Sequence, residues 1–163
     1  MEDRKGLKEA YDLDSGVYTA GDTLYVAGTK SLRDAWDDLK IPFGQTSRSQ
    51  RYEDAARTLK AMPQIRRVVG HSLGGAVALE LQQANPGLKS VTYGAPVTSI
   101  SGGERYRHAG DPVAALDFGA TTTLPTGVNP HSYETLAARH HEFAKGTSKN
   151  GYTNADNSIS LYR

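Results

Sequence analysis

The chain has 163 residues, of which 37% are hydrophobic, and its 19 Lys and Arg residues against 18 Asp and Glu give a net charge of +1. This length suits one compact domain, residues 1–163, with its own apolar core. The balanced charge excludes a basic field that would recruit nucleic acid, and no apolar segment approaches the length of a membrane span. The absence of cysteine excludes disulfides, thiol catalysis and thiolate metal sites.

The chain begins Met-Glu-Asp-Arg-Lys-Gly-Leu-Lys, so charges stand where a secretory signal would have its apolar stretch. No export signal is visible, and an intracellular location is the default expectation. A processed secreted protein, or a domain cut from a larger polyprotein or particle, would look the same.

The first predicted elements are two strands, residues 16–20 and 23–27. Gly21-Asp22 joins them in a hairpin that adds an antiparallel edge to a sheet. A helix is expected over residues 31–40, where apolar side chains repeat at helical spacing: Leu32, Ala35, Trp36 and Leu39. After a linker at residues 44–49, the same spacing over residues 52–62 predicts a second helix, which Pro63 ends.

The rest of the chain alternates strands with helices. Strands are expected over residues 65–69, 88–93 and 105–109, and helices over residues 76–83 and 133–139. Residues 147–158 are polar and are expected to form a surface loop that ends in a short strand at residues 158–162. This alternation predicts an α/β fold, a mostly parallel sheet with helices on both faces.

The sequence Gly-His-Ser-Leu-Gly-Gly at residues 70–75 lies between a predicted strand and a predicted helix, which is the context of a nucleophile elbow. Such a turn pushes Ser72 Oγ outward at the carboxyl edge of the sheet, and Gly70 and Gly74 make the turn sterically possible. A phosphate-binding loop is excluded, because Ala76 and Val77 stand where Lys and then Ser or Thr would follow. A small-residue connection that contains a serine by chance remains the alternative.

A serine nucleophile needs an acid and then a histidine later in the chain. Asp111 follows the strand predicted at residues 105–109, which would deliver it to the carboxyl edge of the sheet. His131 lies in a loop with Pro and Gly, where catalytic histidines of this architecture are found. Asp117 is the reserve acid.

The other histidines fit the role of the base less well. His71 lies inside the elbow and faces the wrong way, and His108 falls within a predicted strand. His140 and His141 end the helix predicted at residues 133–139, where a solvated histidine complements the helix dipole. The run His140-His141-Glu142 is no metal site, because adjacent side chains on a helix diverge. No metal and no cofactor is expected.

Taken together, these motifs resemble the class 3, fungal-type lipases. The resemblance covers about residues 23–133, and its matching segments occur in the same order as in that family. Its blocks are residues 26–29, 31–33, 36–39, the elbow, Tyr93-Gly94-Ala95-Pro96, Asp111-Pro112-Val113 with Leu116 and Leu124-Pro125, and the His131 loop. The resemblance implies that Thr29, directly after a glycine, is the oxyanion residue and that its hydroxyl adds a donor. Ala27 stands where the family usually has an arginine, and family members are generally longer.

The helix predicted at residues 31–40 follows Thr29, where the lid of these lipases begins. Its apolar stripe with Trp36 would then cover the active site in water and open on a lipid surface, which predicts a transient lipid contact. The alternative is an ordinary helix packed on the sheet. Both interpretations stay open.

We therefore expect a minimal α/β-hydrolase that cleaves carboxylic esters, acyl lipids in particular, through an acyl-enzyme. Ser72 attacks the carbonyl, His131 carries the proton, Asp111 orients His131, and the N–H groups of Thr29 and Leu73 bind the oxyanion. The same triad serves thioesterases, acyltransferases and peptidases, which stay open as alternatives. A catalytically silent binding or structural module with this fold is the alternative from a different class.

Overall fold

The structure is a computed structural model, and it describes residues 2–29, 50–96, 102–123, 129–144, 152–153 and 159–160. The helices are α1 (Asp3–Asp12), α3 (Gln50–Ala61), α4 (Leu73–Ala84) and α5 (Tyr133–Ala144). The strands are β1 (Val17–Ala20), β2 (Thr23–Val26), β3 (Arg67–His71), β4 (Lys89–Tyr93), β5 (Glu104–His108), β6 (Thr121–Thr123), β7 (Tyr152–Thr153) and β8 (Ile159–Ser160). The predicted helix at residues 31–40 and the linker at residues 44–49 lie outside the described residues.

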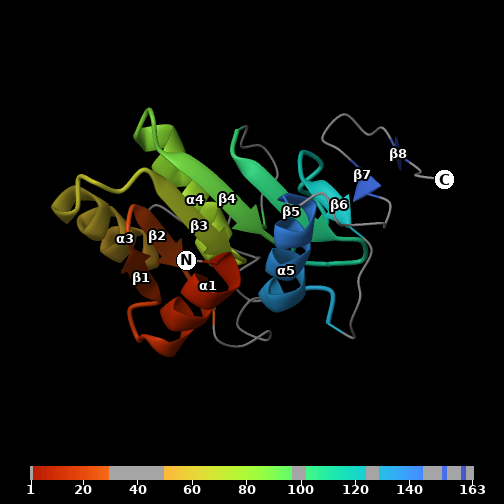
Figure 1. The fold of residues 1–163 in the computed structure, drawn as a ribbon, viewed down its shortest axis with the longest axis horizontal. Coiled ribbons are helices and arrows are strands. Elements are labelled where there is room, and N and C mark those ends of the chain that lie inside the picture. Colours follow the sequence, from red (N-terminus) through yellow and green to blue (C-terminus); the bar gives the residue numbers. More distant parts are fainter. Residues whose placement is uncertain are drawn as a thin grey trace.

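The described strands form one sheet in the order of the chain (Figure 1). Strands β2 to β6 run parallel to one another, and β1 pairs antiparallel with β2. The two-residue strands β7 and β8 extend the sheet in antiparallel fashion. This arrangement confirms the predicted α/β fold, with its mostly parallel sheet and its N-terminal antiparallel hairpin.

Helices cover both faces of this sheet. On one face, side chains of α3 and α4 pack on Leu24 and Val68. On the other face, side chains of α1 and α5 pack on Tyr25 and Val69, and Figure 1 shows these two helices lying together across the strands. Successive side chains of a strand point to opposite faces, which is why the neighbours Leu24 and Tyr25 belong to different clusters.

The sides on which the helices lie follow from the connections. When parallel strands are added in chain order through crossovers of one hand, the crossover helices fall on the same face of the sheet. The helices α3 and α4 make such crossovers, from β2 to β3 and from β3 to β4. The opposite face is covered by α1, which precedes β1, and by α5, which follows β6.

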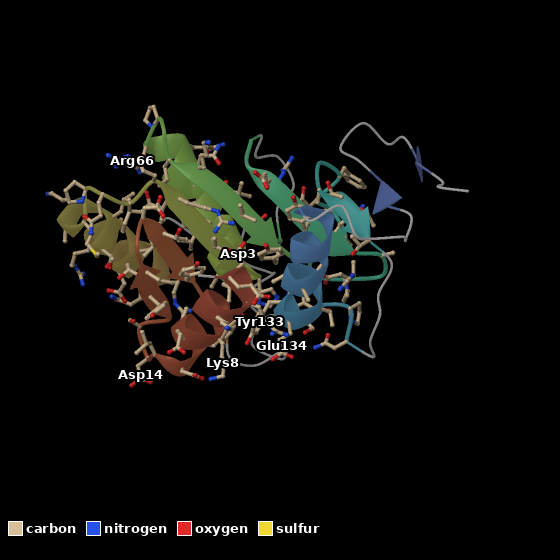
Figure 2. The ribbon with its side chains drawn as sticks, viewed as in Figure 1. Asp3, Lys8, Asp14, Arg66, Tyr133 and Glu134 are labelled. Atoms are coloured by element: carbon tan, nitrogen blue, oxygen red, sulfur yellow. The ribbon has the colours of Figure 1, made fainter. Side chains whose placement is uncertain are left out.

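Helix α1 was not predicted, because its sequence is mostly charged. Its apolar side is narrow, with Leu7, Ala10 and the partly buried Tyr11 packed in the core. Asp3, labelled in Figure 2, anchors its first turn through two bonds of 2.7 Å from Arg67 and one of 2.8 Å from the Tyr93 hydroxyl. A partly buried ion pair and a short apolar stripe thus fix a helix whose local pattern is weak.

Other boundaries differ from the prediction. Helix α5 continues to Ala144, because the helical pattern does not stop at residue 139, so His140 and His141 lie within it rather than at its end. Strand β7 lies inside residues 147–158, which were predicted as a loop, and β6 was not predicted at all. Both strands are short and are defined by pairing with a neighbour rather than by their own pattern. None of the described helices is long and apolar enough to cross a membrane.

Candidate active site

Ser72 occupies a strained turn between β3 and α4. Its φ of 53° and ψ of −127° make it the one non-glycine residue with positive φ in the part of the chain that the structure describes. Such a conformation costs on the order of 1–3 kcal/mol and persists only where the surroundings enforce it. The enforcing bonds include one from the Ser72 N–H to the Tyr93 carbonyl, at 3.0 Å. The structure thus has a strained strand-to-helix turn at the predicted position, and the role of Ser72 as a nucleophile stays a prediction.

Two glycines allow β3, α4 and β2 to meet at this turn. A Cβ on Gly70 would overlap the backbone of Gly74, and a Cβ on Gly74 would overlap the carbonyl of Val26. These contacts involve backbone atoms and cannot be relieved by a rotamer change. The need for glycine at both positions therefore agrees with the sequence analysis.

Asp111 and His131 lie together in a buried pair. His131 Nδ1 is 3.0 Å from Asp111 Oδ1 and 2.9 Å from Oδ2, and the two side chains are 6% and 0% exposed. Asp111 Oδ1 also accepts bonds from the Val113 and Ala114 N–H groups, at 2.9 and 3.3 Å. Because an ionised carboxylate only accepts, Nδ1 carries the hydrogen, and Nε2 of the neutral ring is left as the acceptor.

His131 Nε2 is buried and has no hydrogen-bond partner among the described residues. A hydrogen bond between Ser72 and His131 Nε2, which a catalytic triad would need, is therefore not formed in the part of the chain that the structure describes. Gly94 nevertheless places the pair near the elbow. The Tyr93 carbonyl binds the Ser72 N–H, and a Cβ on Gly94 would lie 3.1 Å from His131 Cε1. The predicted serine, acid and histidine therefore gather around the end of β4.

The end of β2 passes beside Ser72. A Cβ on Gly28 would lie 2.7 Å from the Ser72 Cβ, so only glycine fits at this approach. Arg51 holds this segment by donating Nη1 to the carbonyls of Ala27 and Gly28, at 2.6 and 3.0 Å. Thr29 follows directly and is half-buried.

The other predicted oxyanion residue, Leu73, opens α4, and the first N–H groups of a helix have no partner within the helix. Of the two predicted oxyanion residues, Leu73 therefore follows Ser72 directly, and Thr29 follows Gly28, whose backbone approaches Ser72. The role of Arg51 gave no signal in the sequence, because its partners are backbone carbonyls more than twenty positions away.

His108 and Asp117 take structural positions. His108 ends β5 with Nδ1 2.8 Å from Thr123 Oγ1 and Nε2 2.9 Å from Thr135 Oγ1, in agreement with its prediction as a strand residue. Asp117 forms a buried ion pair with Arg105 at 3.2 Å. Burial raises the pKa of Asp117, and Arg105 opposes that rise. The structure thus brings Asp111 to His131 and leaves the reserve acid Asp117 with an arginine.

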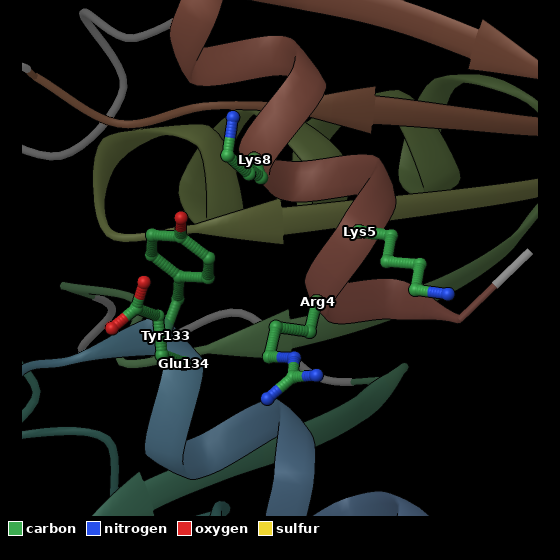
Figure 3. A pocket seen from close by; sticks show the side chains of 5 residues that line it. All are labelled: Arg4, Lys5, Lys8, Tyr133 and Glu134. Atoms are coloured by element: carbon green, nitrogen blue, oxygen red, sulfur yellow. The ribbon is translucent and has the colours of Figure 1, made fainter.

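A pocket of about 330 Å³ lies where α1 and α5 adjoin, lined by Arg4, Lys5, Lys8, Tyr133 and Glu134 (Figure 3). Its basic side chains do not converge, since Lys5 points away from Tyr133 in Figure 3, and Lys8 pairs with Asp12 at 2.5 Å. None of the proposed catalytic side chains lines it. Across the described residues, no cluster of three or more potential ligands could hold a metal ion.

Comparison with known proteins assigns no family or function to this chain. No family model matches the sequence, and no curated protein matches it.

Proposed function

We propose that this protein is a serine hydrolase that cleaves carboxylic esters through an acyl-enzyme. One observation carries the proposal: a buried histidine, oriented by a carboxylate and with its second nitrogen unpartnered, lies near a serine held in a strained strand-to-helix turn. Strained backbone and buried unpartnered polar atoms are costly, and they concentrate at functional sites. A packing role alone gives no reason for both to occur at one place.

In the proposed reaction, Ser72 Oγ attacks the ester carbonyl while its proton passes to His131 Nε2. The carbonyl electrons move to oxygen, and the N–H groups of Leu73 and Thr29 stabilise that oxyanion. The C–O bond to the alcohol then breaks as the imidazolium protonates the leaving oxygen, which leaves Ser72 acylated. Asp111 stabilises the imidazolium meanwhile.

A water molecule completes the cycle. His131 accepts its proton as the water oxygen attacks the acyl carbon, and a second oxyanion forms in the same place. Collapse of this intermediate releases the carboxylic acid and returns the proton to Ser72. The likeness to class 3 lipases favours acyl lipids as the substrates.

Labelling with a fluorophosphonate tests the proposal, because this probe phosphonylates only an activated serine. The wild-type protein should be labelled at Ser72, Ser72→Ala should not be labelled, and His131→Ala should be labelled far more slowly. With a soluble ester, either substitution should lower turnover by roughly 10⁴ to 10⁶, and the double variant should lose little more. His108→Gln is the matched control, since it changes a buried histidine outside the proposed site.

Two results would count against these assignments. An unlabelled wild-type protein that turns over no ester would indicate a binding or structural module instead. A larger loss in Asp117→Asn than in Asp111→Asn would show that the acid is misassigned. Thioesters and acyl acceptors, assayed beside esters of graded chain length in solution and in emulsion, separate lipases from other acyl-transfer enzymes.

A further inference from the structure

Tyr11 and His71 have no role in the proposed reaction, and they form a chain of hydrogen bonds next to the Ser72 turn. His71 Nε2 lies 2.8 Å from the backbone oxygen of His131, and His71 Nδ1 lies 2.5 Å from the Tyr11 hydroxyl. That hydroxyl oxygen also accepts the Gly28 N–H, at 3.1 Å. The chain therefore runs from the His131 loop, through the elbow and α1, to the end of β2.

The direction of each bond follows from the chemistry of the groups. A carbonyl oxygen only accepts, so His71 Nε2 carries the ring hydrogen and Nδ1 of the neutral ring accepts. The Gly28 N–H only donates, so Tyr11 directs its single hydrogen to His71 Nδ1. Every donor in this chain has an acceptor, without a charged group or a water molecule.

Burial keeps this pattern unchanged across the physiological pH range. Burial, aided by the neighbouring His131, lowers the pKa of His71 to about 3, so its ring stays neutral. Burial raises the pKa of Tyr11 to about 12, so its hydroxyl keeps its proton. Ring packing adds rigidity. Tyr11 stacks on Tyr133 with their ring centroids 5.2 Å apart, and the ring centroids of His71 and His131 are 4.7 Å apart.

The segments joined by this chain are those whose relative placement the proposed reaction requires. His131 supplies the base, and its backbone has another bond to Asn129 Oδ1 at 3.0 Å. Gly28 precedes Thr29 and approaches Ser72. A displacement of about 1 Å between such groups costs on the order of 10²-fold in rate.

We propose that Tyr11 and His71 are positioning residues that fix the His131 backbone and the Gly28 segment relative to the Ser72 elbow. This inference rests on the proposed function, because it explains how the base and an oxyanion donor are held at the serine.

Substitutions can cut the chain at chosen bonds. Tyr11→Phe removes the hydroxyl and keeps the ring that stacks on Tyr133. In His71→Gln, the side-chain amide reaches the place of Nε2 and can still donate to the His131 carbonyl, whereas the shorter side chain of His71→Asn cannot. Tyr18→Phe and His108→Gln are matched controls with the same chemical changes elsewhere in the core.

We expect Tyr11→Phe and His71→Asn to lower kcat by roughly 10- to 100-fold with KM changed less than about threefold. His71→Gln should recover the part of the His71→Asn loss that comes from the His131 carbonyl bond, and both controls should stay within about twofold of wild type. The second readout is NMR of the His131 ring. Its Nδ1–H, bonded to Asp111, should give a downfield signal that persists in His71→Gln and broadens in Tyr11→Phe and His71→Asn.

The two readouts separate this inference from the proposed function. If the wild-type protein cleaves no ester but the His131 signal responds as expected, the positioning role is supported while the hydrolase proposal fails. If the protein is an active esterase but Tyr11→Phe changes neither kcat nor the signal, the positioning role is overturned while the hydrolase proposal stands. Equal losses in the control variants would also overturn it, because they would indicate a general loss of packing.

Discussion

At the end of β4, the backbone of Gly94 lies directly against the Asp111–His131 pair. Its φ is +61°, and a Cβ there would lie 3.0 Å from Asp111 Oδ2 and 3.1 Å from His131 Cε1. These distances are shorter than ordinary van der Waals contacts, so an added methyl group has to displace the pair. The absence of a side chain at Gly94 thus lets Asp111 and His131 lie close to the end of β4.

Replacing Gly94 by alanine should therefore damage the site as well as the fold. We expect Gly94→Ala to lower ester turnover by about threefold to tenfold, because contacts of 3.0 and 3.1 Å displace the imidazole by less than the 1 Å that costs about 10²-fold. Gly21→Ala is a close control, since Gly21 has a φ of +60° and no atom within 4 Å of the added carbon. Both variants should lose about 1 kcal/mol of unfolding free energy through the left-handed conformation, as measured by urea denaturation. Equal turnover in the two variants would contradict this displacement.

Among the secondary-structure elements, α3 contacts the candidate site through Arg51. Its guanidinium binds the Gly28 carbonyl, and the peptide bond from Gly28 to Thr29 is planar and trans. In such a peptide the C=O and the N–H point in opposite directions, so Arg51 fixes the direction of the Thr29 N–H. A cation on the carbonyl also polarises the peptide and makes that N–H a stronger donor.

We expect Arg51→Lys to lower kcat by about 10- to 100-fold with little change in KM, because misdirecting one oxyanion donor costs transition-state stabilisation. An ammonium group is a point donor and does not reproduce the fork that reaches both carbonyls. Arg57→Lys, on the same helix, is the control, since Arg57 is exposed and pairs with Asp54 at 3.1 Å. Equal kinetics for the two variants and the wild-type protein would exclude Thr29 as a donor oriented from α3.

Helix α1 depends on Asp3, which receives hydrogen bonds from β3 and β4. In Asp3→Asn, an amide nitrogen replaces one acceptor and leaves an Arg67 or Tyr93 donor without its partner. We expect a loss of about 2–4 kcal/mol in unfolding free energy, nearer the lower value because Arg67 is 29% exposed and water can replace part of the contact. Urea denaturation would measure it.

The control for Asp3 lies at the other end of the same helix. Asp12 pairs with the solvent-exposed Lys8, so Asp12→Asn should leave the urea midpoint nearly unchanged. If both variants unfolded at the wild-type midpoint, the buried network would contribute nothing to anchoring α1. Because α1 carries Tyr11, a loosened Asp3 should also reduce ester turnover.

For the whole molecule, buried His71 predicts a specific sensitivity to acid. Its pKa is about 3 in the folded state against 6.5 in the unfolded chain. Between these values the unfolded state binds a proton that the folded state excludes, so the unfolding free energy falls as the pH falls. The slope from this one group is at most about 1.4 kcal/mol per pH unit.

We therefore expect the unfolding free energy of the wild-type protein to fall more steeply between pH 6 and about 4 than that of His71→Gln, which lacks the titrating group. Urea denaturation at each pH gives both curves, and the carboxylates shared by the two proteins cancel in the difference. Parallel curves would show that His71 is protonated at similar pH in both states.

The order of the sheet places the site. Strands β2, β3, β4 and β5 are parallel neighbours, so their carboxyl ends meet at one edge. Gly28, Ser72, Gly94 and Asp111 each follow one of these ends within three residues. Residues far apart in the sequence thus gather at this edge, and His131 is added from the loop before α5.

The sequence by itself determined the alternation of strands and helices, the hairpin at Gly21 and the turn at Ser72. Those features depend on apolar periodicity and on glycine and proline sterics, which act over a few residues. Ser72, Asp111 and His131 were proposed from the order of their motifs, and their catalytic roles stay predictions.

Only the tertiary structure decided which acid meets His131, and only it showed Tyr11, His71 and Arg51 gathered behind the elbow. Asp111 and Asp117 both follow β5, and nothing local tells which one faces the histidine and which one faces Arg105. Helix α1 likewise depends on partners such as Arg67, 64 positions from Asp3. Such bonds join side chains across the fold, so the chain has no local pattern that encodes them.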